Sequence, residues 1–401
     1  MAASRALVDL SPDEHGDRIA LVRDGQVSYQ PATRVDIGYT HEGASGSCRY
    51  IRRAGNGDLY VTGPSLRRTM FRSSDGGRSW SATPYDLGME RFDLRQMERD
   101  SEYGWIGAFT ILKDDTFLIF VAPSNHRRST EGYLSRSMDL GATWSTEPID
   151  LPLGRYRSIS AGNADMIELA DGTLLLTLHF YYYVELEEER ALPFDQQGSF
   201  GYVLRSTDGG RTWPEAHCHL LYGGEAHLLD LPSGNLLVAS RKQRNTSLPG
   251  DPEDVTVTMR ANGYDPEYTG FHEPIEATTA SCKHMAVSES HDGGRTWVNE
   301  QRVSGYEQCS GELTLLADGS TVVLTYDYRY PDRFAWSGVR GRVSYDAGRT
   351  WEPEEYVLGE GENYPGCIAM DDGGMITVCP YRNRGPIQAV HWRPRPQDGS
   401  P

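Results

Sequence analysis

Apolar residues recur along this chain in short paired runs, and a polar turn separates the two runs of each pair. The runs are rich in Val, Ile, Leu, Phe and Tyr, and the turns contain Asn-Gly, Asp-Asp, Asp-Gly or Ser-Gly. This combination is typical of β-hairpins. Six hairpins are predicted, at Tyr50–Thr62, Ala108–Val121, Met166–Leu178, His227–Ser240, Leu313–Thr325 and Cys367–Cys379.

A second pattern, Ser-x-Asp-x-Gly-x-Thr/Ser-Trp, follows five of the six predicted hairpins. Its Asp accepts hydrogen bonds from nearby amides, its Gly supplies a positive φ, and its Thr or Ser hydroxyl closes the loop. The Trp is expected to enter the adjoining core. We therefore predict a tight turn between two further strands, with a scaffold role for the Asp rather than a catalytic or metal-binding one. The copies, whose Asp residues are 54 to 84 residues apart, begin at Ser73, Ser137, Ser206, Ser290 and Ser344.

Six four-stranded units predict an all-β fold, a six-bladed propeller in which each unit buries its faces against its neighbours. The last unit lacks the Ser-x-Asp turn, and only Ile387–Trp392 follows its hairpin. We expect an N-terminal strand within 18–31, from Arg18–Val22 or Gln26–Tyr29, to close the ring. One domain, 1–401, would comprise blades at roughly 45–100, 101–155, 156–220, 221–305, 306–360 and 361–395.

Two segments are longer than a blade requires, Leu87–Tyr103 and the Pro-containing stretch Gln243–Thr279. Long loops on a compact scaffold frequently carry function. We expect both to form walls over a central site.

Charge and cysteine spacing narrow the possible partners. Lys and Arg number 39 against 57 Asp and Glu, a net charge of −18, which argues against nucleic acid and anionic membranes as partners. The six Cys show no CxxC spacing, so we expect reduced buried thiols, no metal site and no cofactor. The segment Met1–Leu7 has no long apolar run, which favours a cytoplasmic location, with a secreted form as the alternative. Oligomeric state is not indicated.

Candidate chemistry gathers where the strands of a propeller converge on its axis. The start of each first strand and the end of each second strand meet at one end of the axis, opposite the Ser-x-Asp turns. Those positions carry Arg, carboxylate, His and Tyr side chains. At first strands they are Arg49, Asp165, Glu225, Glu312 and Tyr364, and after second strands they are His179, Arg241, Asp327, Arg329 and Arg382.

Five such turns, known as Asp boxes, in a chain of six units resemble the sialidase (neuraminidase) superfamily over nearly the whole length. The resemblance implies a Tyr nucleophile assisted by a Glu, three Arg that hold the substrate carboxylate, and an Asp acid/base. A neutral phenol avoids repulsion from the carboxylate at the anomeric carbon, and Arg matches a carboxylate with two hydrogen bonds.

The resemblance implies roles for individual residues. Tyr364 in Asn-Tyr-Pro-Gly-Cys matches the nucleophile, and Glu225 followed by a strand pair ending at Arg241 matches the base and one Arg. Arg49 matches the first Arg, with Arg52 and Arg53 as competitors. The remaining candidates for substrate binding are Arg333 and Arg340 for the third Arg, and Asp165, Glu312 and Arg382. Each residue has a structural alternative, such as a turn carboxylate or a strand-capping Tyr.

The sequence departs from the family pattern at two points. The Pro expected after the first Arg-Ile pair is absent, since the chain reads Arg49-Tyr50-Ile51-Arg52. The loop that should carry the acid/base reads Gly-Pro-Ser-Leu-Arg-Arg at 63–68, without a carboxylate. A glycosidase must protonate its leaving oxygen, so Glu102, or else Glu98, is expected to take that role.

Three functions follow from these observations. The first is an exo-acting, sialidase-like glycoside hydrolase that removes a terminal sialic acid or a related acidic sugar. The second is a propeller polysaccharide lyase acting on uronic-acid glycans, with His126 and His179 near the cleft. The third is a propeller that binds glycan without catalysis. In each case the partner is an acidic sugar or glycan.

Overall fold

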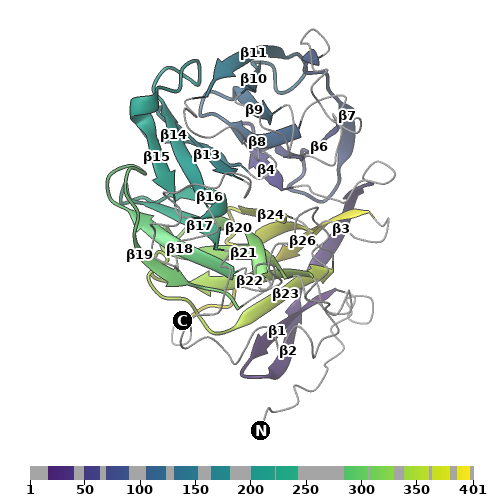
Figure 1. The fold of residues 1–401 in the computed structure, drawn as a ribbon. Helices are drawn as coiled ribbons and strands as arrows, with labels where there is room; N and C mark the ends of the chain where they lie inside the picture. The colour runs from purple at the N-terminus through teal and green to yellow at the C-terminus, as the bar shows by residue number, and fades with distance from the viewer. Residues whose placement is uncertain are drawn as a thin grey trace, which may run out of the picture.

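The computed structural model of the chain is all-β, with six blades of four antiparallel strands arranged in a ring (Figure 1). The first strands of neighbouring blades contact one another around the centre in a closed circle. The predicted fold class is therefore confirmed. The structure describes residues 17–39, 49–63, 69–89, 105–122, 131–151, 164–180, 200–221, 223–242, 284–305, 308–328, 338–360, 364–379 and 386–397.

Each blade runs outward from its first strand to its fourth. Blade 1 comprises β4 (Tyr50–Arg53), β5 (Leu59–Thr62), β6 (Thr69–Ser73) and β7 (Ser81–Pro84). Blade 2 comprises β8 (Trp105–Ile111), β9 (Phe117–Ala122), β10 (Glu131–Ser137) and β11 (Ser145–Asp150). Blade 3 comprises β12 (Met166–Glu168), β13 (Leu174–Phe180), β14 (Phe200–Ser206) and β15 (Cys218–Leu221), which follows a short 3-10 turn at Glu215–His217.

The second half of the ring repeats this order. Blade 4 comprises β16 (Gly224–Asp230), β17 (Leu236–Lys242), β18 (His284–Ser290) and β19 (Val298–Arg302). Blade 5 comprises β20 (Gln308–Leu315), β21 (Val322–Tyr328), β22 (Gly338–Ser344) and β23 (Glu355–Glu360). Blade 6 comprises β24 (Gly366–Ala369), β25 (Met375–Cys379), β26 (Ile387–Trp392) and, from the other end of the chain, β3 (Thr33–Gly38). The two apolar runs of each predicted hairpin correspond to the first and second strands of a blade.

Apolar side chains fill the six interfaces between blades. Each of six buried clusters draws its residues from two neighbouring blades. Between blades 6 and 1, for example, Ile376 and Ile387 pack with Ile51 and Phe71. Because strand side chains alternate, each blade presents one apolar face to each neighbour. The blades are therefore fixed relative to one another by apolar packing.

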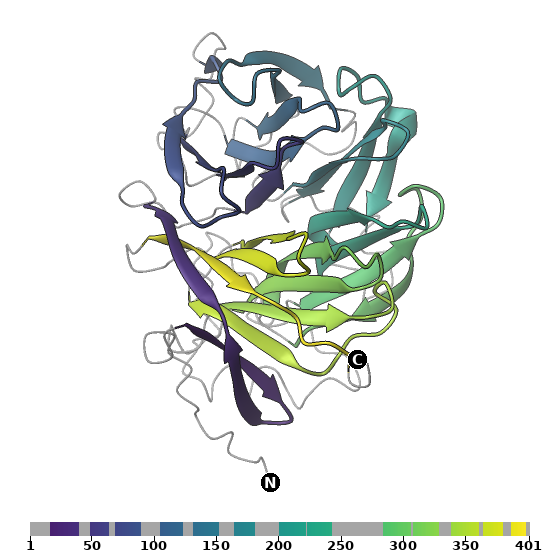
Figure 2. The same cartoon turned by 180° about the vertical axis from the view of Figure 1, so that it is seen from behind.

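The N-terminal strands differ from the sequence-based expectation. Arg18–Val22 and Gln26–Tyr29 do lie in strands, β1 (Arg18–Arg23) and β2 (Gln26–Pro31), but β1 pairs with β23 and extends blade 5 to six strands. The strand beside β26 is β3, which Figure 2 shows in purple next to the yellow C-terminal strand.

The physical reason for this difference is where the apolar residues of each strand pack. Ile19 and Leu21 of β1 enter the core between blades 5 and 6, whereas Ile37 of β3 enters the core between blades 6 and 1. With only Val35 and Ile37 as apolar residues, the sequence of β3 predicts a strand weakly. The hairpin before it has the stronger strand pattern, and for this reason the sequence favours that hairpin as the closing strand.

The five Ser-x-Asp turns share one hydrogen-bond pattern. At the turn of blade 3, Ser206 Oγ donates to Asp208 Oδ1 at 2.7 Å and accepts the Gly210 amide at 2.9 Å. The other carboxylate oxygen, Oδ2, accepts the Thr212 hydroxyl at 2.6 Å. Gly210 has a φ of +86°, which glycine adopts without strain. Trp213 is buried against the core between blades 2 and 3, and its indole NH donates to the Gly210 carbonyl at 3.1 Å.

These hydrogen bonds predict a pH-dependent contribution to stability. Burial acts to raise the pKa of Asp208, but hydrogen bonds from Thr212 and Ser206 lower it to about 2, from an ordinary value of 3.8. A lowered folded-state pKa gives stability that is present above pH 3.8 and is lost as the pH falls through about 2. We expect Asp208→Ala to reduce stability at neutral pH by on the order of 1 kcal/mol, allowing for solvent exposure.

Thermal unfolding between neutral pH and pH about 2 measures this contribution. The difference between wild type and Asp208→Ala should shrink across the acid range, because wild-type Asp208 then becomes protonated. Asp150→Ala, at the exposed end of β11, is the control. Equal pH dependence of the two variants would contradict the assignment.

No helix in the described part of the chain has the length and apolar character needed to cross a membrane.

Candidate active site

Three consecutive blades start with a residue in the left-handed region of backbone conformation. Glu225 at the start of β16 has a φ of 48°, Ser310 in β20 has a φ of 58°, and Tyr364 just before β24 has a φ of 52°. Residues with side chains rarely adopt this conformation, which costs about 1–2 kcal/mol, and such outliers cluster at functional sites. Register shifts accompany the first two, between Gly224 and His227 and between Cys309 and Glu312.

The side chains of these three residues meet at the carboxylate of Glu225. The Tyr364 hydroxyl donates to Glu225 Oε1 at 2.8 Å, and Arg241 Nη1 reaches the same oxygen at 2.9 Å. Ser310 Oγ donates to the other oxygen, Oε2, at 3.2 Å. Arg241 comes from β17, where it pairs with Gly224. Glu225 is only 1% exposed, so these contacts replace water around a buried carboxylate.

Arg49 completes this group from blade 1. Its guanidinium carbon lies 5.9 Å from the centre of the Tyr364 ring, within the range of a cation–π contact. The first strand of blade 6 passes very close to Arg49, since a Cβ placed on Gly366 would clash with the Arg49 carbonyl oxygen. Only a residue without a side chain fits there. Closure of the ring at Gly366 therefore brings Arg49 and Tyr364 together.

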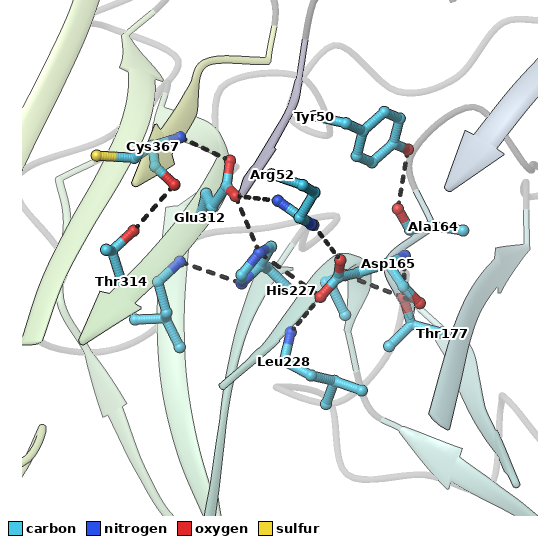
Figure 3. Close-up of polar contacts among 12 residues, drawn as sticks. Tyr50, Arg52, Ala164, Asp165, Thr177, His227, Leu228, Glu312, Thr314 and Cys367 are labelled. Atoms are coloured by element: carbon cyan, nitrogen blue, oxygen red, sulfur yellow. Dashed lines mark hydrogen bonds and ion pairs between the residues drawn. The ribbon is translucent and has the colours of Figure 1, made fainter. Parts of the chain in front are cut away.

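A second polar group, the central ion network, links the first strands near the axis (Figure 3). It consists of Arg52, Asp165, His227 and Glu312. Arg52 Nη2 lies 3.1 Å from Asp165 Oδ1, and its Nη1 lies 3.1 Å from Glu312 Oε1. His227 Nε2 lies 3.2 Å from Glu312 Oε1 and 3.6 Å from Asp165 Oδ2. Blades 1, 3, 4 and 5 each contribute one member.

Each acceptor in the central ion network also binds a backbone amide of the next blade. Asp165 Oδ2 accepts the Leu228 amide at 2.9 Å, His227 Nδ1 accepts the Leu313 amide at 3.2 Å, and Glu312 Oε2 accepts the Cys367 amide at 3.1 Å. Because these bonds join consecutive first strands, they fix blades 3 to 6 at the centre of the ring.

Both ring nitrogens of His227 are engaged. Its Nδ1 accepts a hydrogen bond from the Leu313 amide, and its Nε2 faces the carboxylates of Asp165 and Glu312. His227 therefore links the central ion network to the first strand of the next blade.

The electrostatics of Asp165 follow from these contacts. Burial acts to raise its pKa, but interactions with His227, with the guanidinium groups of Arg52 and Arg49, and with the Leu228 amide outweigh burial and lower the pKa below its ordinary value. Asp165 is therefore ionised at neutral pH, although it is fully buried.

The structure brings four predicted site residues into one group, namely Arg49, Glu225, Arg241 and Tyr364. Asp165 and Glu312, predicted to bind substrate, are instead engaged with Arg52 and His227. Arg340 Nε lies 3.4 Å from Glu355 Oε1, on β23, the fourth strand of blade 5. Other predicted positions lie outside the described residues or, for His179, have no described side chain. They are Glu98, Glu102, His126, His179, Arg329, Arg333 and Arg382.

Sequence reasoning missed three residues of these two groups. Arg52 was considered only as a competitor of Arg49, and His227 only as the first residue of an apolar run. Ser310 carried no signal beyond its place before a predicted hairpin. A strand-by-strand alignment of the six units would have found it, because Ser310 occupies in blade 5 the position of Glu225 in blade 4.

Among the described residues, no group of three or more His, Cys, Asp and Glu side chains could hold a metal ion. Three described cysteines, Cys218, Cys367 and Cys379, are free thiols. Burial raises the pKa of Cys367 and of Cys379 to about 12, so both are protonated at neutral pH.

No protein-family model matches this sequence. No curated protein matches it either. Solved structures do match. A Hadza microbial sialidase superposes with a TM-score of 0.56 at 16% identity, covering 92% of this chain and 70% of the sialidase. The Trypanosoma rangeli sialidase complex with 2,3-difluorosialic acid, a covalent intermediate, gives a TM-score of 0.52 at 14% identity. The chain spans 58% of that protein, and 90% of this chain is covered.

At these identities the similarity shows the fold: the chain is a sialidase-like six-bladed propeller.

Proposed function

We propose that this protein is an exo-acting glycoside hydrolase of the sialidase type, which removes a terminal sialic acid or a related acidic sugar from a glycan. The observation that carries the proposal is the 2.8 Å hydrogen bond from the Tyr364 hydroxyl to Glu225 Oε1, with Arg241 on the same carboxylate and Arg49 at the Tyr364 ring. A nucleophile that is hydrogen-bonded to a general base and lies beside cationic side chains is suited to covalent catalysis. The fold shared with sialidases supports it.

In the proposed complex, Arg49 and Arg241 bind the substrate carboxylate. Arg241 Nη1 contacts Glu225, and a guanidinium can also give a planar anion two parallel hydrogen bonds. Both Arg residues are at most 4% exposed. A site with so little water strengthens the attraction to an anion.

The chemical step begins with a proton transfer. Tyr364 Oη passes its proton to Glu225 Oε1 and forms a bond to the anomeric carbon. The bond from that carbon to the leaving oxygen breaks, and its electron pair goes to the leaving oxygen. That oxygen takes a proton from a general acid, the role proposed for Glu102. Water then attacks the anomeric carbon and gives a proton to the Glu102 carboxylate, the bond to Tyr364 breaks, and Glu225 returns its proton to the phenolate. The reaction consumes water and needs no cofactor.

A fluorogenic sialoside and a uronic-acid polymer together test the proposal. Release of the fluorophore from the sialoside by the full chain is the expected result. New ultraviolet absorbance from an unsaturated product of the polymer would instead show a lyase and overturn the proposal. Glycan binding without turnover of either compound would show a binding protein and would overturn it equally.

A further inference from the structure

Arg49, Glu225, Arg241, Ser310 and Tyr364 form one cluster, the Glu225–Tyr364 group. Ser310 contacts Glu225 from strand β20, which contributes no other member of this group. Its hydroxyl donates to Glu225 Oε2 at 3.2 Å, whereas Tyr364 and Arg241 both contact Oε1. Ser310 is 1% exposed. The two oxygens of the carboxylate therefore have different partners.

That difference fixes the orientation of the carboxylate. The last torsion of a Glu side chain is broad and roughly two-fold, so contacts to a single oxygen leave the carboxylate free to rotate. A donor on Oε2 restricts this rotation and holds Oε1 toward Tyr364. It also stabilises the charged form of Glu225, because a hydrogen bond to a carboxylate favours ionisation.

The backbone of Ser310 itself is in an unfavourable conformation. Its φ of 58° would suit glycine better than serine, and Gly311 follows directly. Glu225 and Tyr364 share this left-handed conformation at the starts of the neighbouring blades. The same local geometry thus presents three side chains toward one point.

We propose that Ser310 is a positioning residue, which orients the Glu225 carboxylate so that Oε1 accepts the proton of Tyr364. This inference rests on the proposed function. It assigns to Ser310 no contact with substrate.

Two substitutions separate positioning from a purely structural role. Ser310→Ala and Ser310→Gly both remove the donor, but glycine also relieves the left-handed backbone. We expect both variants to lower kcat for the sialoside about tenfold with little change in KM, while Ser310→Gly melts at a higher temperature than Ser310→Ala. The acid limb of the kcat profile should move to higher pH in both, because loss of the donor raises the pKa of Glu225.

Ser135→Ala is the matched control. Ser135 is buried in blade 2, and its hydroxyl shares a 2.7 Å hydrogen bond with Thr146 Oγ1, so its loss should leave kcat and the pH profile unchanged. If the wild type is active and Ser310→Gly equals it in kcat and in pH profile, the inference about Ser310 is overturned while the proposed function stands. A wild type inactive on the sialoside would overturn the proposed function itself.

Discussion

Tyr364→Phe is expected to lower kcat for a fluorogenic sialoside by about a thousandfold or more while the fold stays intact. The substitution removes one oxygen atom, which is the proposed nucleophile and the donor of the 2.8 Å hydrogen bond to Glu225. The ring stays, and so does its contact with Arg49. Steady-state kinetics measures the effect, and circular dichroism with thermal unfolding verifies the fold.

Tyr345→Phe is the matched control, because it also removes a half-buried tyrosine hydroxyl that donates a hydrogen bond. Tyr345 lies in the Ser-x-Asp turn of blade 5, and its hydroxyl donates to the Arg395 carbonyl at 2.5 Å. We expect it to retain wild-type kcat. A fluorinated sialic acid analogue provides an independent measurement. It should form a covalent adduct that increases the intact protein mass of the wild type but not that of Tyr364→Phe. Full activity in Tyr364→Phe, or an adduct on another residue, would exclude the proposed mechanism.

Arg52→Met is expected to destabilise the protein by about 3–5 kcal/mol, the cost of leaving buried charges without a partner. Arg52 contacts both Asp165 and Glu312 at 3.1 Å, and these carboxylates are 0% and 2% exposed. Urea unfolding at neutral pH measures the loss.

Arg53→Met provides the comparison at the adjacent position. Arg53 pairs with Asp371 at 2.6 Å, but that carboxylate is 94% exposed, so the pair should contribute less than about 1 kcal/mol. The loss of unfolding free energy in Arg52→Met, relative to wild type, should become smaller as the pH falls into the range where carboxylic acids are protonated. Protonation there removes the uncompensated negative charges. Similar losses in the two variants would show that the central ion network does not stabilise the ring.

Local sequence patterns allowed most of the fold to be predicted. The turn at Asp208 depends on partners within four residues, Ser206 and Thr212, so its geometry follows from a short motif. Strand β3 could not be assigned in the same way. Its pairing with β26 joins positions at opposite ends of the chain, and its few apolar residues do not distinguish it from the hairpin before it.

The site was predictable to the extent that topology determines it. Glu225 and Tyr364 stand at the starts of first strands and Arg241 lies near the end of a second strand, so a ring of blades was expected to bring them together. The direction of a strand side chain was harder to predict. Arg340, expected in the cleft, is in register with Tyr326, and both contact Glu355 on the neighbouring strand β23.

The origin of the fourth strand of blade 6 has a consequence for biosynthesis. During translation β3 emerges before the five blades that separate it from its partner β26, so β3 must wait with an unpaired edge until β26 has been made. The approach of Gly366 to Arg49 depends on the same late closure. A nascent chain therefore closes its ring and brings Arg49 to Tyr364 in the same step, and a chain released before β26 is made would do neither.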